Sequence, residues 1–222
     1  MSDLRPIRVW DLPVRITHWA LVLCLAGLYA TGEYDWLDME WHMRFGYATL
    51  ALVLFRLLWG VFGSEHARFA DFVRGPGAIV GYLRSWNRPD HRGSLGHNPL
   101  GAIGVLALLL LTLAQVTTGL FASDEIEVFG PLSERVSTDT SEWLTDWHHL
   151  GQQFLLILIA VHVLAVALHY LLRKENLVGP MFTGRKLAPD GTDARWRPLW
   201  LAALLFAISL GAVWALSVWG PA

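Results

Sequence analysis

The segment 147-WHHLGQQFLLILIAVHVLAVALHY-170 decides the fold, because it is apolar and long enough to cross a membrane yet contains four histidines. A membrane-spanning helix needs about 20 predominantly apolar residues. An ionisable side chain inside such a helix is energetically costly and is therefore a candidate for a functional site. The segment predicts a membrane helix whose histidines carry chemistry.

The composition of the whole chain is that of a membrane protein. Of the 222 residues, 54% are hydrophobic and 16% are charged, whereas charged residues make up about 25% of a soluble domain. The net charge is -2 and there is no basic tract, which argues against a nucleic-acid partner. The single cysteine, Cys24, excludes an internal disulfide and a metal site built from cysteines alone.

Four further segments are apolar enough to cross a membrane. Asn98 can cap the third span, because Pro99 follows it at the first helical position. The sequence therefore predicts an all-α integral membrane protein that forms a single domain over residues 1–222. The five predicted spans are residues 16–31, 42–60, 99–122, 148–172 and 198–219.

The distribution of Lys and Arg predicts the orientation. These residues gather at the N-terminus and in the connections at about 61–98 and 173–197, whereas the other two connections are acidic. Positively charged loops stay on the cytoplasmic side of a membrane. We therefore expect a multi-pass protein of the bacterial inner membrane, with a cytoplasmic N-terminus and a periplasmic C-terminus.

The histidine spacing within the fourth span predicts two stacked sites. His148 and His162 are 14 residues apart, which is nearly four helical turns, so they share a face and are separated by about 21 Å. By depth, His42 is level with His148 near the outer surface, and His18 is level with His162 on the cytoplasmic side. The 13-residue spacing between His149 and His162 turns His149 away from the face of His162.

Each pair, His42 with His148 and His18 with His162, could hold one planar metal macrocycle between helices. Haem b fits best, because the chain lacks the C-x-x-C-H motif of covalent haem attachment and the carboxylates of a di-iron centre. Two imidazoles leave no open coordination position, which suits electron transfer. We expect two haem b groups and no catalytic residue.

Two arginines and the remaining histidines have competing interpretations. Arg56 could pair with a propionate of the inner haem, and Arg44 with a propionate of the outer haem. Contact of either arginine with lipid phosphate is the alternative. For the other histidines a structural role is favoured, although two of them, His97 and His169, are also candidates for a quinone site. This group comprises His66, His91, His97 and His169.

Five motifs together carry a specific resemblance. They are 9-VWDLPVRITHW-19, 54-LFRLLWGVFGSEHARFADFV-73, 96-GHNPLGA-102, the segment 147–170 quoted above, and 175-ENLVGPMFTGRK-186. Together they cover most of residues 7–186. In this combination the chain resembles a bacterial cytochrome b561, within the wider family that includes the b-type cytochrome subunits of nickel–iron hydrogenases and formate dehydrogenases.

The resemblance implies a four-helix membrane bundle that holds two b haems, over about residues 7–186. By position, His18, His42, His148 and His162 correspond to the axial ligands. The span 198–219 is additional and is expected to pack outside the bundle. The resemblance also implies electron transfer between the quinone pool and a periplasmic partner, such as a c-type cytochrome or a subunit of a redox enzyme.

Two alternatives remain open from the sequence. The protein could be a self-contained superoxide:quinone oxidoreductase, although few positive residues lie near the outer site to attract an anion. It could also be a cofactor-free helical membrane protein whose histidines form hydrogen bonds between helices. The direction of electron flow, the quinone type and a homo-oligomeric state are not determined by the sequence.

Overall fold

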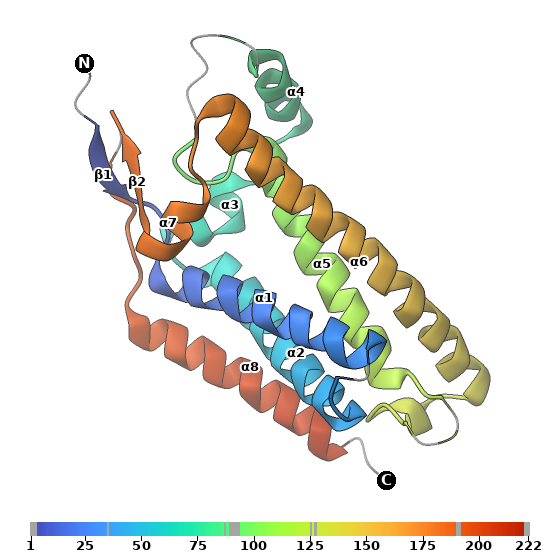
Figure 1. Cartoon of the computed structure of the whole chain (residues 1–222). Coiled ribbons are helices and arrows are strands. Elements are labelled where there is room, and N and C mark those ends of the chain that lie inside the picture. The colour runs from blue at the N-terminus through green and yellow to red at the C-terminus, as the bar shows by residue number, and fades with distance from the viewer. Residues whose placement is uncertain are drawn as a thin grey trace.

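The computed structural model describes residues 4–34, 36–86, 88, 94–124, 126, 128–189 and 192–219. Within these residues, five helices are long and apolar enough to cross a membrane (Figure 1). This confirms the predicted multi-pass helical membrane protein. The five helices are α1 (Leu12–Glu33), α2 (Met39–Phe62), α5 (Pro99–Phe121), α6 (Thr138–Arg173) and α8 (Leu199–Trp219).

Side-chain caps fix where three of these helices begin. The Asn98 side chain accepts a hydrogen bond from the backbone N–H of Gly101 at 2.7 Å, as the sequence predicts. Ser137 caps α6, so this helix begins well before the predicted boundary at residue 148. Its first turns are polar, and a search for apolar stretches therefore misses them. Asp11 likewise starts α1 before the predicted residue 16.

The shorter elements lie between the spans, and two of them form a small β-ribbon that the sequence does not predict. Strand β1 pairs antiparallel with β2, with Arg5 opposite Ala188 and Arg8 opposite Arg185. The elements are β1 (Arg5–Arg8), η1 (Glu65–Ala67), α3 (Phe69–Phe72), α4 (Pro76–Ser85), η2 (Ser133–Arg135), α7 (Val178–Thr183) and β2 (Arg185–Ala188). We call the ribbon's side of the molecule the ribbon end and the opposite side the far end.

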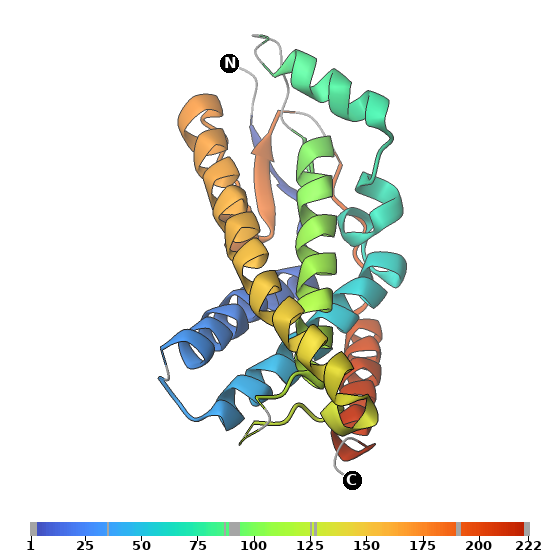
Figure 2. The same cartoon turned by 90° about the vertical axis from the view of Figure 1, so that its right-hand side faces the viewer.

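The spanning helices form two leaves. Helix α1 packs along α2 in one leaf, and α5 packs along α6 in the other. Helix α2 also contacts α5, which joins the leaves, and α8, which lies on its other side (Figures 1 and 2). Among the described residues, α1 and α6 make no extensive backbone contact with each other. Part of the space between the leaves is a cavity lined by α1, α2, α5 and α6, and we call this space the slot.

A clasp at the ribbon end ties the start of α1 to the segment that follows α6. The carbonyl of Gly184 accepts hydrogen bonds from the backbone N–H of Val9 at 2.9 Å and of Trp10 at 3.2 Å. The Trp19 indole donates to the carbonyl of Met181 and stacks on Phe182, with ring centroids 4.5 Å apart. We call β1, β2, α7 and these contacts the ribbon clasp.

A buried carboxylate joins α1 to α2. One oxygen of Asp11 accepts from the backbone N–H of Val14 at 2.8 Å, and the other accepts from the Trp59 indole at 2.9 Å. Both Asp11 and Trp59 are buried. The same side chain therefore caps one helix and satisfies the polar group of the largest buried residue on its neighbour.

The clasp generates a stability prediction at Gly184. This residue has φ of 76°, and an added Cβ would lie 2.7 Å from the carbonyl oxygen of Trp10. Gly184→Ala should therefore lower the free energy of unfolding by roughly 1–2 kcal/mol, measured by thermal or denaturant unfolding in detergent. The control is Gly75→Ala, where an added Cβ meets nothing within 4 Å. Equal stability of the two variants would contradict the prediction.

Candidate functional site

The structure brings together the two histidine pairs that the spacing predicts. The ring centroids of His42 on α2 and His148 on α6 are 6.3 Å apart. Those of His18 on α1 and His162 on α6 are 6.5 Å apart. Each pair therefore bridges the slot between the two leaves, the first at the far end and the second nearer the ribbon end.

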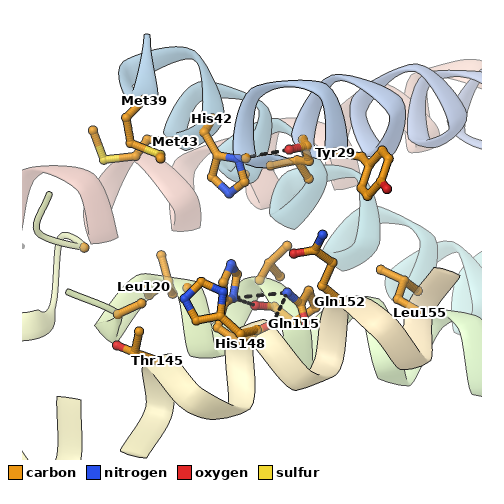
Figure 3. Close-up of a pocket in the computed structure, with 18 of the residues that line it drawn as sticks. Tyr29, Met39, His42, Met43, Gln115, Leu120, Thr145, His148, Gln152 and Leu155 are labelled. Carbon is orange, nitrogen blue, oxygen red and sulfur yellow. Dashed lines mark hydrogen bonds between the residues drawn. The ribbon is translucent and has the colours of Figure 1, made fainter. Parts of the chain in front are cut away.

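A cavity surrounds the far-end pair. It has a volume of about 500 Å³, and all four helices α1, α2, α5 and α6 line it. His42 and His148 face each other across it from α2 and α6 (Figure 3). Apolar side chains such as Met43, Leu120 and Leu155 form much of the remaining wall. Cofactor sites are typically apolar cavities of about 300–1,000 Å³ with a few convergent polar groups.

Hydrogen bonds at Nδ1 orient both far-end rings. Nδ1 of His42 lies 3.1 Å from the carbonyl oxygen of Leu28 and 3.1 Å from the hydroxyl of Thr31. Nδ1 of His148 lies 2.9 Å from the carbonyl oxygen of Gln115. A carbonyl oxygen only accepts, so these contacts favour the neutral tautomer that carries its proton on Nδ1. This leaves Nε2 unprotonated, which is the form that binds a metal.

Two glycines make room for these rings. An added Cβ at Gly32 would lie 3.0 Å from the Cε1 atom of His42. At Gly119 it would lie 2.7 Å from the Cε1 atom of His148. Any larger residue at Gly119 would displace the histidine, so this glycine is part of the site's architecture.

The separation of the rings fits a metal held between them. An imidazole nitrogen binds a first-row metal at about 2.0–2.1 Å, so two axial imidazoles have centroids roughly 6 Å apart once the rings themselves are included. In the described part of the chain, no group of three or more His, Cys, Asp or Glu could hold a metal. Two imidazoles per site match a macrocycle that supplies its own equatorial nitrogens.

A buried arginine lies in the region of the ribbon-end pair. Arg56 on α2 is only 6% exposed, its guanidinium lies 5.4 Å from the ring centre of Phe69, and its Nη1 has no hydrogen-bond partner. Asp11 is the carboxylate that interacts with it electrostatically. Nδ1 of His18 is also buried and without a partner. Buried donors without acceptors are rare in folded proteins, and each calls for an explanation.

His97 is a second polar side chain in the region of the ribbon-end pair. Its ring packs between those of Trp10 and Phe72, at centroid distances of 4.6 Å and 4.5 Å, and its Nδ1 is buried without a partner. Burial, reinforced by the positive charge of Arg56, lowers the pKa of His97 to about 3. The imidazole is therefore neutral at physiological pH.

The other sequence candidates lie elsewhere. Arg44 forms an ion pair with Glu40, lies over Trp41 at 4.8 Å, and does not line the cavity. Nε2 of His169 lies 3.2 Å from the Tyr82 hydroxyl and 3.3 Å from the side-chain nitrogen of Asn98. His149 differs from the expectation, because it lines the far-end cavity together with His148 although its spacing turns it away from the face of His162. His91 lies outside the described residues.

Sequence reasoning misses the groups that support the far-end histidines. Leu28 and Gln115 contact the rings through backbone carbonyls, which carry no sequence signal, and the Gln115 side-chain amide also donates to the carbonyl of His148 at 2.8 Å. The glycines at positions 32 and 119 could have been found, because a glycine within a membrane helix often marks close packing.

Comparison with known proteins gives distant relatives over most of the chain. The "Probable Ni/Fe-hydrogenase B-type cytochrome subunit" of Cupriavidus necator is 25% identical over 220 residues, covering 85% of this chain and 90% of that protein. The "Probable Ni/Fe-hydrogenase 1 B-type cytochrome subunit" of Escherichia coli K12 is 23% identical, covering 79% and 88%. No solved structure gives a significant match.

A family comparison is more decisive. The sequence profile described as "Prokaryotic cytochrome b561" matches residues 9–184, a range that contains all four paired histidines and excludes α8. The match covers well over half of the chain, and together with the five spanning helices it shows that the chain belongs to the prokaryotic cytochrome b561 family of membrane electron-transfer proteins.

Proposed function

We propose that the protein is a di-haem b cytochrome that carries electrons across the membrane. One haem would be held by His42 and His148, and the other by His18 and His162. The observation that supports this most is the presence of two imidazole pairs, 6.3 Å and 6.5 Å apart, facing each other across the slot. When bound, haem iron supplies one-electron exchange, and axial imidazoles on both faces favour electron transfer over oxygen chemistry.

The chain's own contribution is orientation and exclusion of water. The carbonyls of Leu28 and Gln115 hold the far-end rings with Nε2 directed into the slot. Helices α1, α2, α5 and α6 surround that slot as the haem-binding bundle, and α8 packs against α2 outside it. The apolar wall excludes solvent and keeps the local dielectric constant low, and both influence the redox potential of a metal held there.

The axial spacing gives a route across the membrane. His148 and His162 lie on one helix, so the two sites are separated by about 21 Å along α6. The ribbon end, with its Arg and Lys residues, would face the cytoplasm, and the acidic far end would face the periplasm. Electrons would thus pass through the bilayer between the quinone pool and a periplasmic partner.

The partner is proposed from the relatives. Two proteins that resemble this chain are named as B-type cytochrome subunits of Ni/Fe hydrogenase. We therefore propose a periplasmic redox enzyme of that class as the partner, with a c-type cytochrome as the alternative. The acidic far-end connections would favour a basic docking surface, because complementary charge accelerates encounter.

Two arginines are assigned to haem propionates. Arg56 lies on α2, 14 residues after His42, which places it on the same face about 21 Å further along, at the level of the ribbon-end pair. Its guanidinium would meet a propionate of that haem. The corresponding role of Arg44 at the far-end haem stays a prediction, and it requires the guanidinium to leave Glu40.

Histidine variants test the proposal directly. Dithionite-reduced minus oxidised spectra and pyridine haemochrome assays of the purified protein should give two b haems per chain. His18→Ala and His162→Ala should lose the same haem, and His42→Ala and His148→Ala the other, because each substitution removes one axial ligand. A colourless wild-type protein, or haem retained in all four variants, would refute it and leave the cofactor-free alternative.

A glycine variant tests the far-end geometry without touching a ligand. Gly119→Val should lose the far-end haem, because the new side chain occupies the space of His148. The ribbon-end haem should remain. Gly104→Val on the same helix is the control, since an added Cβ there meets nothing within 4 Å. Loss of haem in both variants alike would show a general folding defect instead.

Proteoliposomes test vectorial transfer. With a quinol in the bilayer and ferricyanide on one side only, oxidation should be fast when the acceptor faces the far end and slow when it faces the ribbon end. His148→Ala and His162→Ala should each abolish the fast phase, because both sites are needed in series. Rapid reduction of the protein by superoxide in stopped flow would instead favour the superoxide:quinone alternative.

A further inference from the structure

We propose that His97 works with Arg56 as a two-donor clamp for one propionate carboxylate of the ribbon-end haem. In this arrangement His97 is a positioning residue for the cofactor, which goes beyond the structural role that its sequence context favours. The inference rests on the proposed function, since it takes the haem between His18 and His162 as given.

The first support is that the Arg56 guanidinium has a buried donor without an acceptor. The guanidinium is buried, Nη1 has no partner, and the protein contact identified on its face is the ring of Phe69. Asp11 lies close enough to interact electrostatically, but its oxygens already accept from Val14 and Trp59. A buried, permanently charged guanidinium with an unused donor matches a carboxylate from a ligand.

The second support is that the same region holds a second unused polar atom. Nδ1 of His97 is buried without a partner, and His97 interacts electrostatically with both Arg56 and the proposed ligand His162. The two unused atoms are thus at the level of the ribbon-end pair. Two buried donors in the region of a proposed axial ligand could together bind a carboxylate at the haem edge.

The ring of His97 is held in a fixed orientation. Trp10 and Phe72 pack on it at 4.6 Å and 4.5 Å, so Nδ1 cannot rotate away to find another acceptor. A neutral imidazole donates one hydrogen bond without adding charge. It therefore complements Arg56, whereas a second cation in its place would repel the guanidinium.

The burial of Arg56 favours a haem propionate over a lipid headgroup as the anion that its guanidinium binds. Arg56 is 6% exposed, and Asp11, Trp59 and Phe69 lie around it. A lipid phosphate would require the guanidinium to reach the surface. A propionate comes from within the slot, on the side where His162 lies.

The test compares substitutions that keep or remove a donor at Nδ1. In His97→Asn the amide nitrogen can replace Nδ1, whereas His97→Gln places its amide near Nε2 and His97→Leu has no donor. Redox titration should show a lower midpoint potential for the ribbon-end haem in His97→Leu and His97→Gln. The reason is that a less compensated propionate charge favours ferric iron. His97→Asn should retain the wild-type potential, and the far-end haem should be unchanged throughout.

Substitutions of Arg56 test the other half of the clamp, and a substitution of Arg68 serves as the control. Arg56→Gln should lower the same potential and weaken binding of that haem roughly tenfold or more, while Arg56→Lys should recover part of the loss. Arg68→Gln is the control, because that guanidinium already bonds the carboxylate of Asp71 at 2.6 Å. The propionate bending band in resonance Raman spectra should shift in His97→Leu and in Arg56→Gln but not in Arg68→Gln.

Reconstitution with haem dimethyl ester identifies the carboxylate source. Esterified propionates cannot accept a charge-assisted bond, so wild type and His97→Gln should have the same ribbon-end potential with the ester and different potentials with native haem. Equal potentials with native haem, or an undiminished difference with the ester, would overturn the clamp. A wild-type protein that binds no haem would overturn the proposed function instead, so the two failures are distinguishable.

Discussion

The architecture depends on keeping α6 apart from α1 and α2 by the width of two imidazole rings, while α2 and α5 join the two leaves. Protein interiors close-pack wherever they can, yet α1 and α6 make little direct backbone contact. The ribbon clasp ties their ends together on one side. On the other, the Gln152 amide donates to the Glu33 carboxylate at 3.2 Å, again linking α6 to α1. The helices are therefore joined at both ends and separated between them.

The distribution of satisfied and unsatisfied polar groups follows from that slot. At the far end, protein carbonyls orient the rings of His42 and His148, so the histidines are held before any ligand arrives. At the ribbon end buried atoms of His18, Arg56 and His97 lack partners, and at the far end the side-chain oxygen of Gln115 does so too. The far-end rings are thus oriented by the protein alone, whereas the rings and the guanidinium at the ribbon end have buried polar atoms that the proposed haem would satisfy. A binding site completed by its ligand also gains stability from it.

Local periodicity accounts for what the sequence could predict. The spans and the pairing of histidines both follow from residue spacing along single helices. The i,i+4 ion pair of Glu40 with Arg44 also follows from spacing along one helix, although Arg44 is expected from the sequence to meet a haem propionate or lipid phosphate. The β-ribbon was not predictable, because it joins short segments at opposite ends of the chain, residues 5–8 and 185–188, that have no strong pattern. The environment of His97 was equally hidden, since Trp10 and Phe72 reach it only through tertiary packing.

Helix α6 supplies one histidine to each pair, so the length of helix between these two histidines fixes the distance between the pairs. His42 and His18 come from separate helices that could adjust independently, whereas His148 and His162 are joined by 13 residues of continuous helix. A single inserted residue between them would turn one relative to the other by about 100°. A change of length in the connecting loops leaves this geometry intact, whereas an insertion or deletion between residues 148 and 162 would move one histidine off the shared face.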